Sequence, residues 1–81
     1  MVIHQKDLHR FIIEKPEGLC YMEYQLEGQT CTVLHTVVPA ACSGQGLAGQ
    51  LAKACYDWGT SQHYILKSDC SYMTAWLKKY H

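Results

Sequence analysis

A cysteine, a histidine and a glycine-containing turn are the parts of this 81-residue chain best suited to chemistry. Cys70 lies shortly after a predicted strand at residues 63–67 and stands in the first turn of a predicted last helix. The dipole of a helix N-terminus lowers a thiol pKa from its free value of about 8.5, so this sulfur is a candidate nucleophile or base. The plain alternative is a small buried residue, which is the usual position of a free cysteine.

His35 is the second candidate, because strand alternation places it on one face with Cys31, Val33 and Val37. In a sheet opened at a βαβ crossover, residues near the carboxyl ends of adjacent strands converge on one crevice. We therefore expect His35 and Cys70 to meet. The alternative is a core histidine with one satisfied nitrogen.

The third candidate is the turn Ser43-Gly44-Gln45-Gly46, which lies between a predicted strand ending at Pro39 and a predicted helix. Backbone N–H groups at a helix N-terminus favour a bound anion, so the turn is a candidate phosphate or pyrophosphate site. It lacks the GK[ST] that a P-loop needs. Without further support, the better interpretation is that Gly44 and Gly46 only permit a tight turn and close packing.

Period-two patterns predict the strands that position these residues. Strands are expected at residues 10–14, 19–26 and 30–38, with turns at residues 15–18 and at Glu27-Gly28. On the second strand, Cys20, Met22, Tyr24 and Leu26 form the apolar face. The second and third strands should pair as an antiparallel hairpin.

Two helices are predicted from a spacing of three to four residues. The first starts at Leu47 and carries Leu51 and Cys55 on its apolar stripe, with Gly59 as a left-handed C-terminal cap. The second is capped by Ser68 or Asp69, and Lys78 and Lys79 favour its C-terminal end. Its predicted buried stripe consists of Tyr72, Trp76 and Tyr80 together with Met73 and Leu77.

These elements predict one α+β domain over residues 1–81, with the order βββαβα. An antiparallel meander should continue through a right-handed βαβ crossover into a parallel fourth strand. The small core of so short a chain leaves both a monomer and a homodimer open.

Charge and cysteine spacing exclude several functions. Seven Lys plus Arg balance seven Asp plus Glu, so no basic patch for nucleic acid is expected. Five cysteines in dissimilar contexts do not suggest a disulfide framework, and without CxxC, HxxxH or CxxH pairs no metal site is predicted. No apolar run approaches the ~20 residues that span a bilayer, so a cytoplasmic protein without a membrane partner is expected.

Three ordered motifs resemble one known family. They are Leu34-His35-Thr36-Val37-Val38-Pro39, Gly44-Gln45-Gly46-Leu47-Ala48 and Cys70-Ser71-Tyr72. In this order and at these intervals they are similar to the minimal GCN5-related N-acetyltransferases, the small single-domain GNAT or YjdJ-like group. The resemblance covers roughly residues 11–80 and implies an α/β-like GNAT core.

The resemblance implies the roles of individual residues. The family's proposed catalytic pair corresponds to Cys70 and His35. The cofactor, acetyl-CoA, is implied to lie between the third and fourth predicted strands, with its pyrophosphate on the glycine turn. The implied cofactor-binding residues are Val37, Val38, Cys42, Ser43, Gly44, Gln45, Gly46, Leu47, Ala48, Ser71 and Tyr72. The chain departs from the family pattern at Ala41 and Ser43, where the family has a polar or basic residue and an arginine, and at Asp69, where it often has a proline.

The implied function is transfer of an acetyl group from acetyl-CoA to an amine whose identity the sequence does not give. Cys70 could carry the acetyl group covalently, or the amine could attack the thioester directly while His35 or a water removes its proton. One alternative is a coenzyme A or acyl-CoA binding module without transferase activity. A third interpretation, a small protein-interaction domain, leaves the three motifs unexplained.

Overall fold

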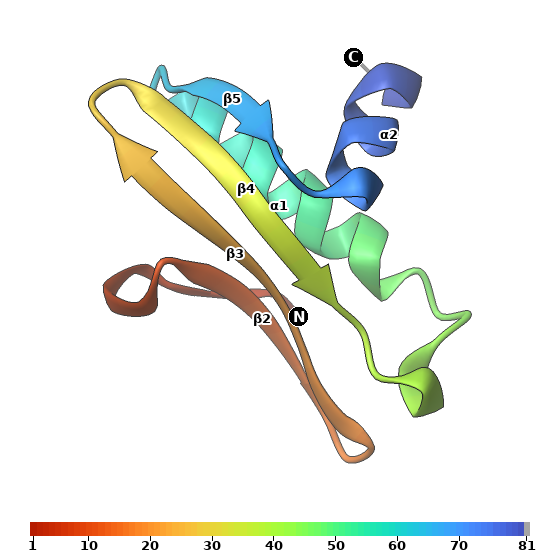
Figure 1. The fold of residues 1–81 in the computed structure, drawn as a ribbon. Coiled ribbons are helices and arrows are strands. Elements are labelled where there is room, and N and C mark those ends of the chain that lie inside the picture. The colour runs from red at the N-terminus through yellow and green to blue at the C-terminus, as the bar shows by residue number, and fades with distance from the viewer. Residues whose placement is uncertain (81) are drawn as a thin grey trace.

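In the computed structural model, which describes residues 1–80, five strands form one sheet and two helices pack on one of its faces (Figure 1). The strands are β1 (Ile3–Gln5), β2 (Arg10–Lys15), β3 (Gly18–Glu27), β4 (Thr30–Val37) and β5 (Ile65–Ser68). The helices are α1 (Leu47–Ser61) and α2 (Ser71–Tyr80), and short 3₁₀ helices cover Lys6–Leu8 and Ala40–Cys42. None of the helices in residues 1–80 has the length and apolar character needed to cross a bilayer.

The sheet order is β1-β2-β3-β4-β5, with antiparallel pairing up to β4 and parallel pairing of β4 with β5. The predicted α+β class, the meander and the crossover into a parallel strand are confirmed. The structure adds β1, which pairs with β2 although two of its three residues are polar. A three-residue strand is too short for an alternation pattern to show.

The core lies between the sheet and the helices. Strand alternation sends Phe11, Ile13, Cys20 and Met22 toward the helices, and the register pairs Phe11 with Met22 and Ile13 with Cys20. From the helices, the side chains of Leu51, Ala52, Cys55 and Met73 complete this core, and each is fully buried. No helix within residues 1–80 covers the opposite face, which we call the open face.

A β-bulge interrupts the pairing of β3 with β4. Tyr24 pairs with Val33, whereas the preceding Glu23 pairs with His35, so Leu34 has no partner across the ladder. Because side chains alternate along a strand, one extra residue exchanges the faces of everything that follows it. Thr36 therefore shares the helix-covered face with its partner Met22, and His35 shares the open face with Glu23.

The helices differ from the sequence prediction at three glycine or aromatic positions. Gly59 lies inside α1, which ends at Ser61, and the residue with positive φ beyond it is His63. A Cβ at position 59 would come within 2.7 Å of Leu66, so this glycine lets β5 approach the helix. Tyr72 and Tyr80 were predicted to be buried, but their side chains are 39% and 56% exposed.

An aromatic cluster attaches β1 to the rest of the fold. The Nε2 atom of His4 lies 2.6 Å from the Tyr24 hydroxyl, and the His4 ring stacks on Phe11 with centroids 4.0 Å apart. The edge of Trp58 from α1 meets the same imidazole at 4.6 Å. Burial lowers the pKa of His4 from its ordinary value of 6.5, and the charge of Lys6 lowers it further.

This lowered pKa predicts a loss of stability in weak acid. The unfolded chain binds a proton at His4 at higher pH than the folded chain does. The contribution of neutral His4 to the free energy of unfolding is therefore present above pH 6.5 and is lost as pH falls through the lower folded-state pKa. We predict that urea unfolding at pH 7.5 and pH 5.5 shows a larger drop in the free energy of unfolding for the wild type than for His4→Gln. Equal drops in the two proteins would contradict this assignment.

Candidate functional site

The glycine turn joins β4 to α1 with a backbone that only glycine adopts easily. Gly44 and Gly46 have φ values of 81° and 71°, which side chains with a Cβ rarely adopt. A Cβ at either position would meet no atom within 4 Å. The two glycines are therefore required by conformation rather than by close packing, and the space beside the turn is open.

The N-terminus of α1 presents backbone amides that no side chain caps. Gly46 is the N-cap residue, and the first hydrogen bond of the helix runs from the Gln50 N–H to the Gly46 carbonyl at 3.2 Å. The Ser43 hydroxyl donates instead to the Ala40 carbonyl at 2.8 Å, so Ser43 does not cap the helix. The amides of residues 47–49 thus remain available to an anion at the positive end of the helix dipole.

Most of the predicted cofactor-binding residues line one pocket of about 290 Å³ at this turn. Its lining residues are Val38, Cys42, Ser43, Gly44, Gly46, Leu47, Ala48, Gly49 and Tyr72. Eight of these nine were singled out from the sequence, and Gly49 is the addition. The predicted residues Val37, Gln45 and Ser71 do not line the pocket, and Val37 lies on the open face opposite Tyr21.

The segment before the glycine turn is anchored on β3. A Cβ at Gly18 would lie 2.9 Å from Cγ of Pro39, so the proline ring packs directly on the glycine backbone. Cys42 is fully buried, and its thiol contacts that of Cys20. Burial raises the pKa of the Cys20 thiol, and the contact with Cys42 raises it further. These two contacts hold the start of the turn against the sheet.

One edge of β4, the strand that leads to the glycine turn, is unpaired over its last residues. Pairing of β4 with β5 ends where Val33 meets Ser68, and the Asp69 N–H donates to the Val33 carbonyl at 2.8 Å. The chain then leaves the sheet for α2, so residues 34–37 have no partner strand on that side within residues 1–80. Figure 1 shows β4 extending well past the end of β5.

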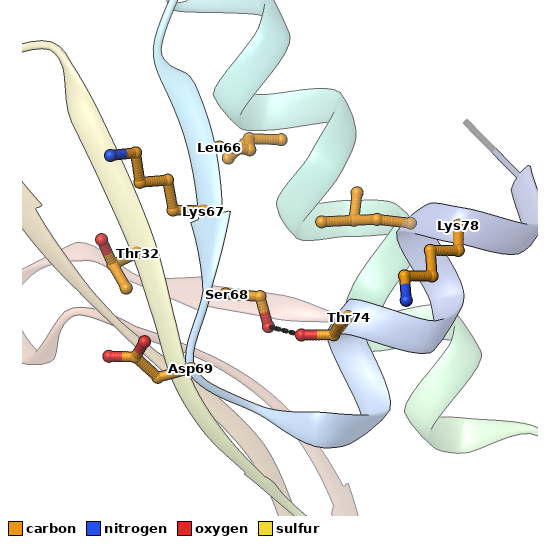
Figure 2. A pocket seen from close by; sticks show the side chains of 8 residues that line it. Thr32, Leu66, Lys67, Ser68, Asp69, Thr74 and Lys78 are labelled. Atoms are coloured by element: carbon orange, nitrogen blue, oxygen red, sulfur yellow. Dashed lines mark hydrogen bonds between the residues drawn. The ribbon is translucent and has the colours of Figure 1, made fainter.

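Cys70 lies at the gap where β5 and β4 separate. It directly precedes α2, its side chain is 8% exposed, and its Sγ lies 3.4 Å from the Thr36 hydroxyl oxygen. The Ser68 hydroxyl accepts from the Cys70 N–H at 3.1 Å and from the Thr74 hydroxyl at 3.0 Å, the second of which is drawn in Figure 2. It also donates to the Cys70 carbonyl at 2.8 Å, so Ser68 fixes this chain reversal. Neither Ser68 nor Asp69 occupies the predicted cap position, because α2 begins at Ser71 and its Thr74 N–H donates to the Cys70 carbonyl.

His35 does not meet Cys70, contrary to the sequence prediction. The bulge at Leu34 turns the imidazole to the open face, whereas the neighbouring Thr36 reaches Cys70 on the helix-covered face. His35 is exposed rather than placed among apolar neighbours, and its Nε2 atom pairs with a carboxylate oxygen of Glu23. A histidine and cysteine on opposite faces of the sheet cannot exchange a proton directly.

The sequence analysis missed Glu23, which the register places opposite His35. The Tyr21 ring meets the His35 ring edge-on at 6.0 Å, and the guanidinium of Arg10 lies 5.8 Å above the Tyr21 ring. A carboxylate that orients an imidazole is a common arrangement for general base catalysis. The sequence signal for Glu23 is alternation along the second predicted strand, and alternation does not specify which residue lies opposite Glu23 across the bulge.

A second pocket of about 550 Å³ lies between the sheet edge at β5 and α2 (Figure 2). It is lined by Thr32, Leu66, Lys67, Ser68, Asp69, Thr74, Leu77 and Lys78. None of these residues belongs to the predicted site. Within residues 1–80, no three His, Cys, Asp or Glu side chains gather in a way that would hold a metal ion.

The spacing of Gly44, Gly46 and Gly49 is also that of the dinucleotide-binding GxGxxG pattern. That pattern requires the glycines to follow a strand directly within a parallel βαβ unit. Here Pro39 and the 3₁₀ helix Ala40–Cys42 separate the strand from the glycines, and the sheet is largely antiparallel. The structure therefore does not support a dinucleotide-binding fold.

The chain is similar to a known protein family. A family model described as GCN5-related N-acetyl-transferase matches residues 10–81. This segment contains the glycine turn, both helices and every strand except β1. A search of curated proteins gives no match.

The packing of Pro39 on Gly18 predicts a coupled effect on stability. Gly18→Ala places a methyl group 2.9 Å from a rigid ring, so we expect it to lower the free energy of unfolding by about 1 to 3 kcal/mol. In a Pro39→Ala background the methyl group has more room, and the same change should cost less. Urea unfolding of the four proteins measures this coupling, and strictly additive effects would contradict it.

Proposed function

Because this chain belongs to the GCN5-related N-acetyltransferase family, we propose that it transfers the acetyl group of acetyl-CoA to an amine. The observation that carries the proposal is that eight of the eleven residues that the resemblance assigns to the cofactor line one pocket beside the uncapped amides of α1. The assignment to the YjdJ-like small acetyltransferases, a cytoplasmic setting and a monomeric or homodimeric state stay predictions.

The cofactor-binding residues fit coenzyme A in two ways. The backbone amides of residues 44–49 suit the pyrophosphate, because they lie at the positive end of the α1 dipole. They have to supply most of its contacts, since neither the pocket lining nor Ala41 offers a cation. The free edge of β4 up to Val38 suits the amide groups of the pantetheine arm, which can pair as a strand would. Ser43 stands where the family has an arginine, and the lost charge-assisted contact weakens binding by about 1 to 3 kcal/mol.

Bound acetyl-CoA supplies an acyl thioester. The open face holds the group best placed to remove the proton of an amine, since His35 is exposed there and Glu23 orients its imidazole. Cys70 lies on the other face with Thr36 as its neighbour, and the imidazole of His35 is turned away from it toward Glu23. Of the two routes that the sequence left open, the geometry favours direct attack by the amine.

The first test is a calorimetric titration with coenzyme A and acetyl-CoA. Gly46→Glu places a carboxylate at the proposed pyrophosphate site and should weaken binding by at least about tenfold, because like charges repel at a site built for an anion. Gly28→Glu is the matched control, since Gly28 also has a positive φ of 60° and no atom near its Cβ position, but lies in the distant β3–β4 turn. Equal binding by both variants, or no heat with the wild type at millimolar ligand, would overturn the proposal.

The second test follows the release of free coenzyme A from acetyl-CoA in the presence of primary amines such as spermidine, a lysine peptide and an amino sugar. We predict that His35→Gln lowers kcat by about 10²-fold to 10⁴-fold and that Glu23→Gln lowers it less. Cys70→Ala should retain turnover and Thr36→Val should do the same.

Two results would contradict this chemistry. Loss of turnover in a folded Cys70→Ala protein, together with acetyl labelling of the wild type at Cys70, would establish the covalent route. Tight binding of acetyl-CoA without release under any condition would identify a binding module rather than an enzyme.

A further inference from the structure

One edge of the sheet is left without a partner strand. β5 is the last strand in the sheet order, so nothing within residues 1–80 pairs with its outer side. The N–H groups of Ile65 and Asp69 donate to carbonyls on the β4 side, at 2.7 Å and 2.8 Å. Because backbone groups point alternately to the two sides of a strand, the N–H and C=O of Leu66 and the N–H of Ser68 point away from β4. An added strand would find its hydrogen-bond partners there.

The second pocket, of about 550 Å³, lies along this edge, and we call it the edge groove. Leu66 from β5 and Leu77 from α2 line it, and both are only partly buried. In Figure 2, Lys67 and Asp69 lie on one side of β5, and Lys78 lies on the other. An extended segment paired with β5 would therefore rest alternate side chains on the two leucines and point the others toward Lys67.

Lysines outnumber carboxylates along the edge groove. Lys67 and Lys78 are exposed, and neither forms an ion pair with another of residues 1–80. Asp69 is the one carboxylate among the lining residues. The excess of positive charge favours a segment that carries acidic side chains, because complementary charge selects the partner.

Lys67 also disfavours a second copy of the chain at this edge. In an antiparallel pair of β5 strands that aligns the outward residues of both copies, Leu66 of one copy faces Ser68 of the other. Lys67 of one copy then lies directly opposite Lys67 of the other, and like charges in that position destabilise a ladder. A lysine on a short edge strand commonly prevents pairing with an identical edge. An acidic partner turns the same charge into an attraction.

We propose that the edge groove binds an extended peptide segment with acidic side chains, which adds to the sheet as a further strand. The peptide backbone pairs with Leu66 and Ser68, its apolar side chains rest on Leu66 and Leu77, and its acidic side chains face Lys67. This inference does not rest on the proposed function, because none of these residues is assigned to the cofactor or to proton transfer.

The test is an NMR titration of the ¹⁵N-labelled protein with a short blocked peptide of alternating valine and glutamate. We expect a Kd below about 1 mM, with the largest amide shifts at Leu66 and Ser68. A peptide of alternating valine and lysine should bind at least about tenfold more weakly. N-methylation of two adjacent central residues removes a donor from each edge of the acidic peptide and should abolish its binding.

Two protein variants separate the edge groove from general attraction to a positive surface. Lys67→Glu should weaken binding of the acidic peptide by about threefold to tenfold, because an exposed attraction becomes a repulsion. Lys79→Glu is the matched control, since it makes the same change of charge on α2 but does not line the edge groove. It should leave the affinity within about twofold of the wild type. Both lysines are exposed, so neither change disturbs the core.

Several outcomes would overturn the inference. They are unchanged amides at Leu66 and Ser68 with millimolar acidic peptide, equal binding of the N-methylated peptide, and equal weakening by the two variants. Shifts at the same two amides that grow with protein concentration, without any peptide, would also overturn it and would show that a second copy pairs with β5 instead.

Discussion

One unpaired residue on β4 decides which side chains reach the helices and which reach solvent. Because Leu34 has no partner across the ladder, the faces of β4 are exchanged beyond it. Thr36 thereby contacts Cys70 on the helix-covered face, and His35 meets Glu23 on the open face. A regular ladder would have put His35 in the core and removed its imidazole from solvent. The proposed role of His35 as the group that removes the amine proton therefore depends on this bulge.

The second constraint is the early end of β5. With only four residues, β5 stops pairing at Ser68, whose hydroxyl fixes the reversal into α2. The edge of β4 that is left unpaired leads to the glycine turn, and Pro39 and Cys42 hold the start of that turn on β3. The unpaired strand edge and the uncapped N-terminus of α1 thus lie at the two ends of one short connecting segment, and each offers backbone groups that a long anionic cofactor with amide groups can use.

Features governed by local periodicity were predictable from the sequence, and features set by long-range pairing were not. Alternation at Cys20, Met22 and Tyr24 gave the core face of β3, and the change from strand formers to glycines located the start of α1 within a residue. The bulge at Leu34 depends on how two strands align, so alternation alone carried His35 to the wrong face. Helical spacing correctly grouped the aromatic residues of α2 but could not show that Tyr80 is exposed instead of buried.

The central claim, that the backbone amides of the glycine turn hold the pyrophosphate of coenzyme A, is tested most directly by an NMR titration of the ¹⁵N-labelled protein with coenzyme A. The account predicts that the largest amide shifts fall at residues 44–49, with further shifts along β4 up to Val38 and small shifts on the β1–β2 side of the sheet. No shifts at millimolar coenzyme A, or shifts confined to the open face around Tyr21 and Glu23, would contradict it.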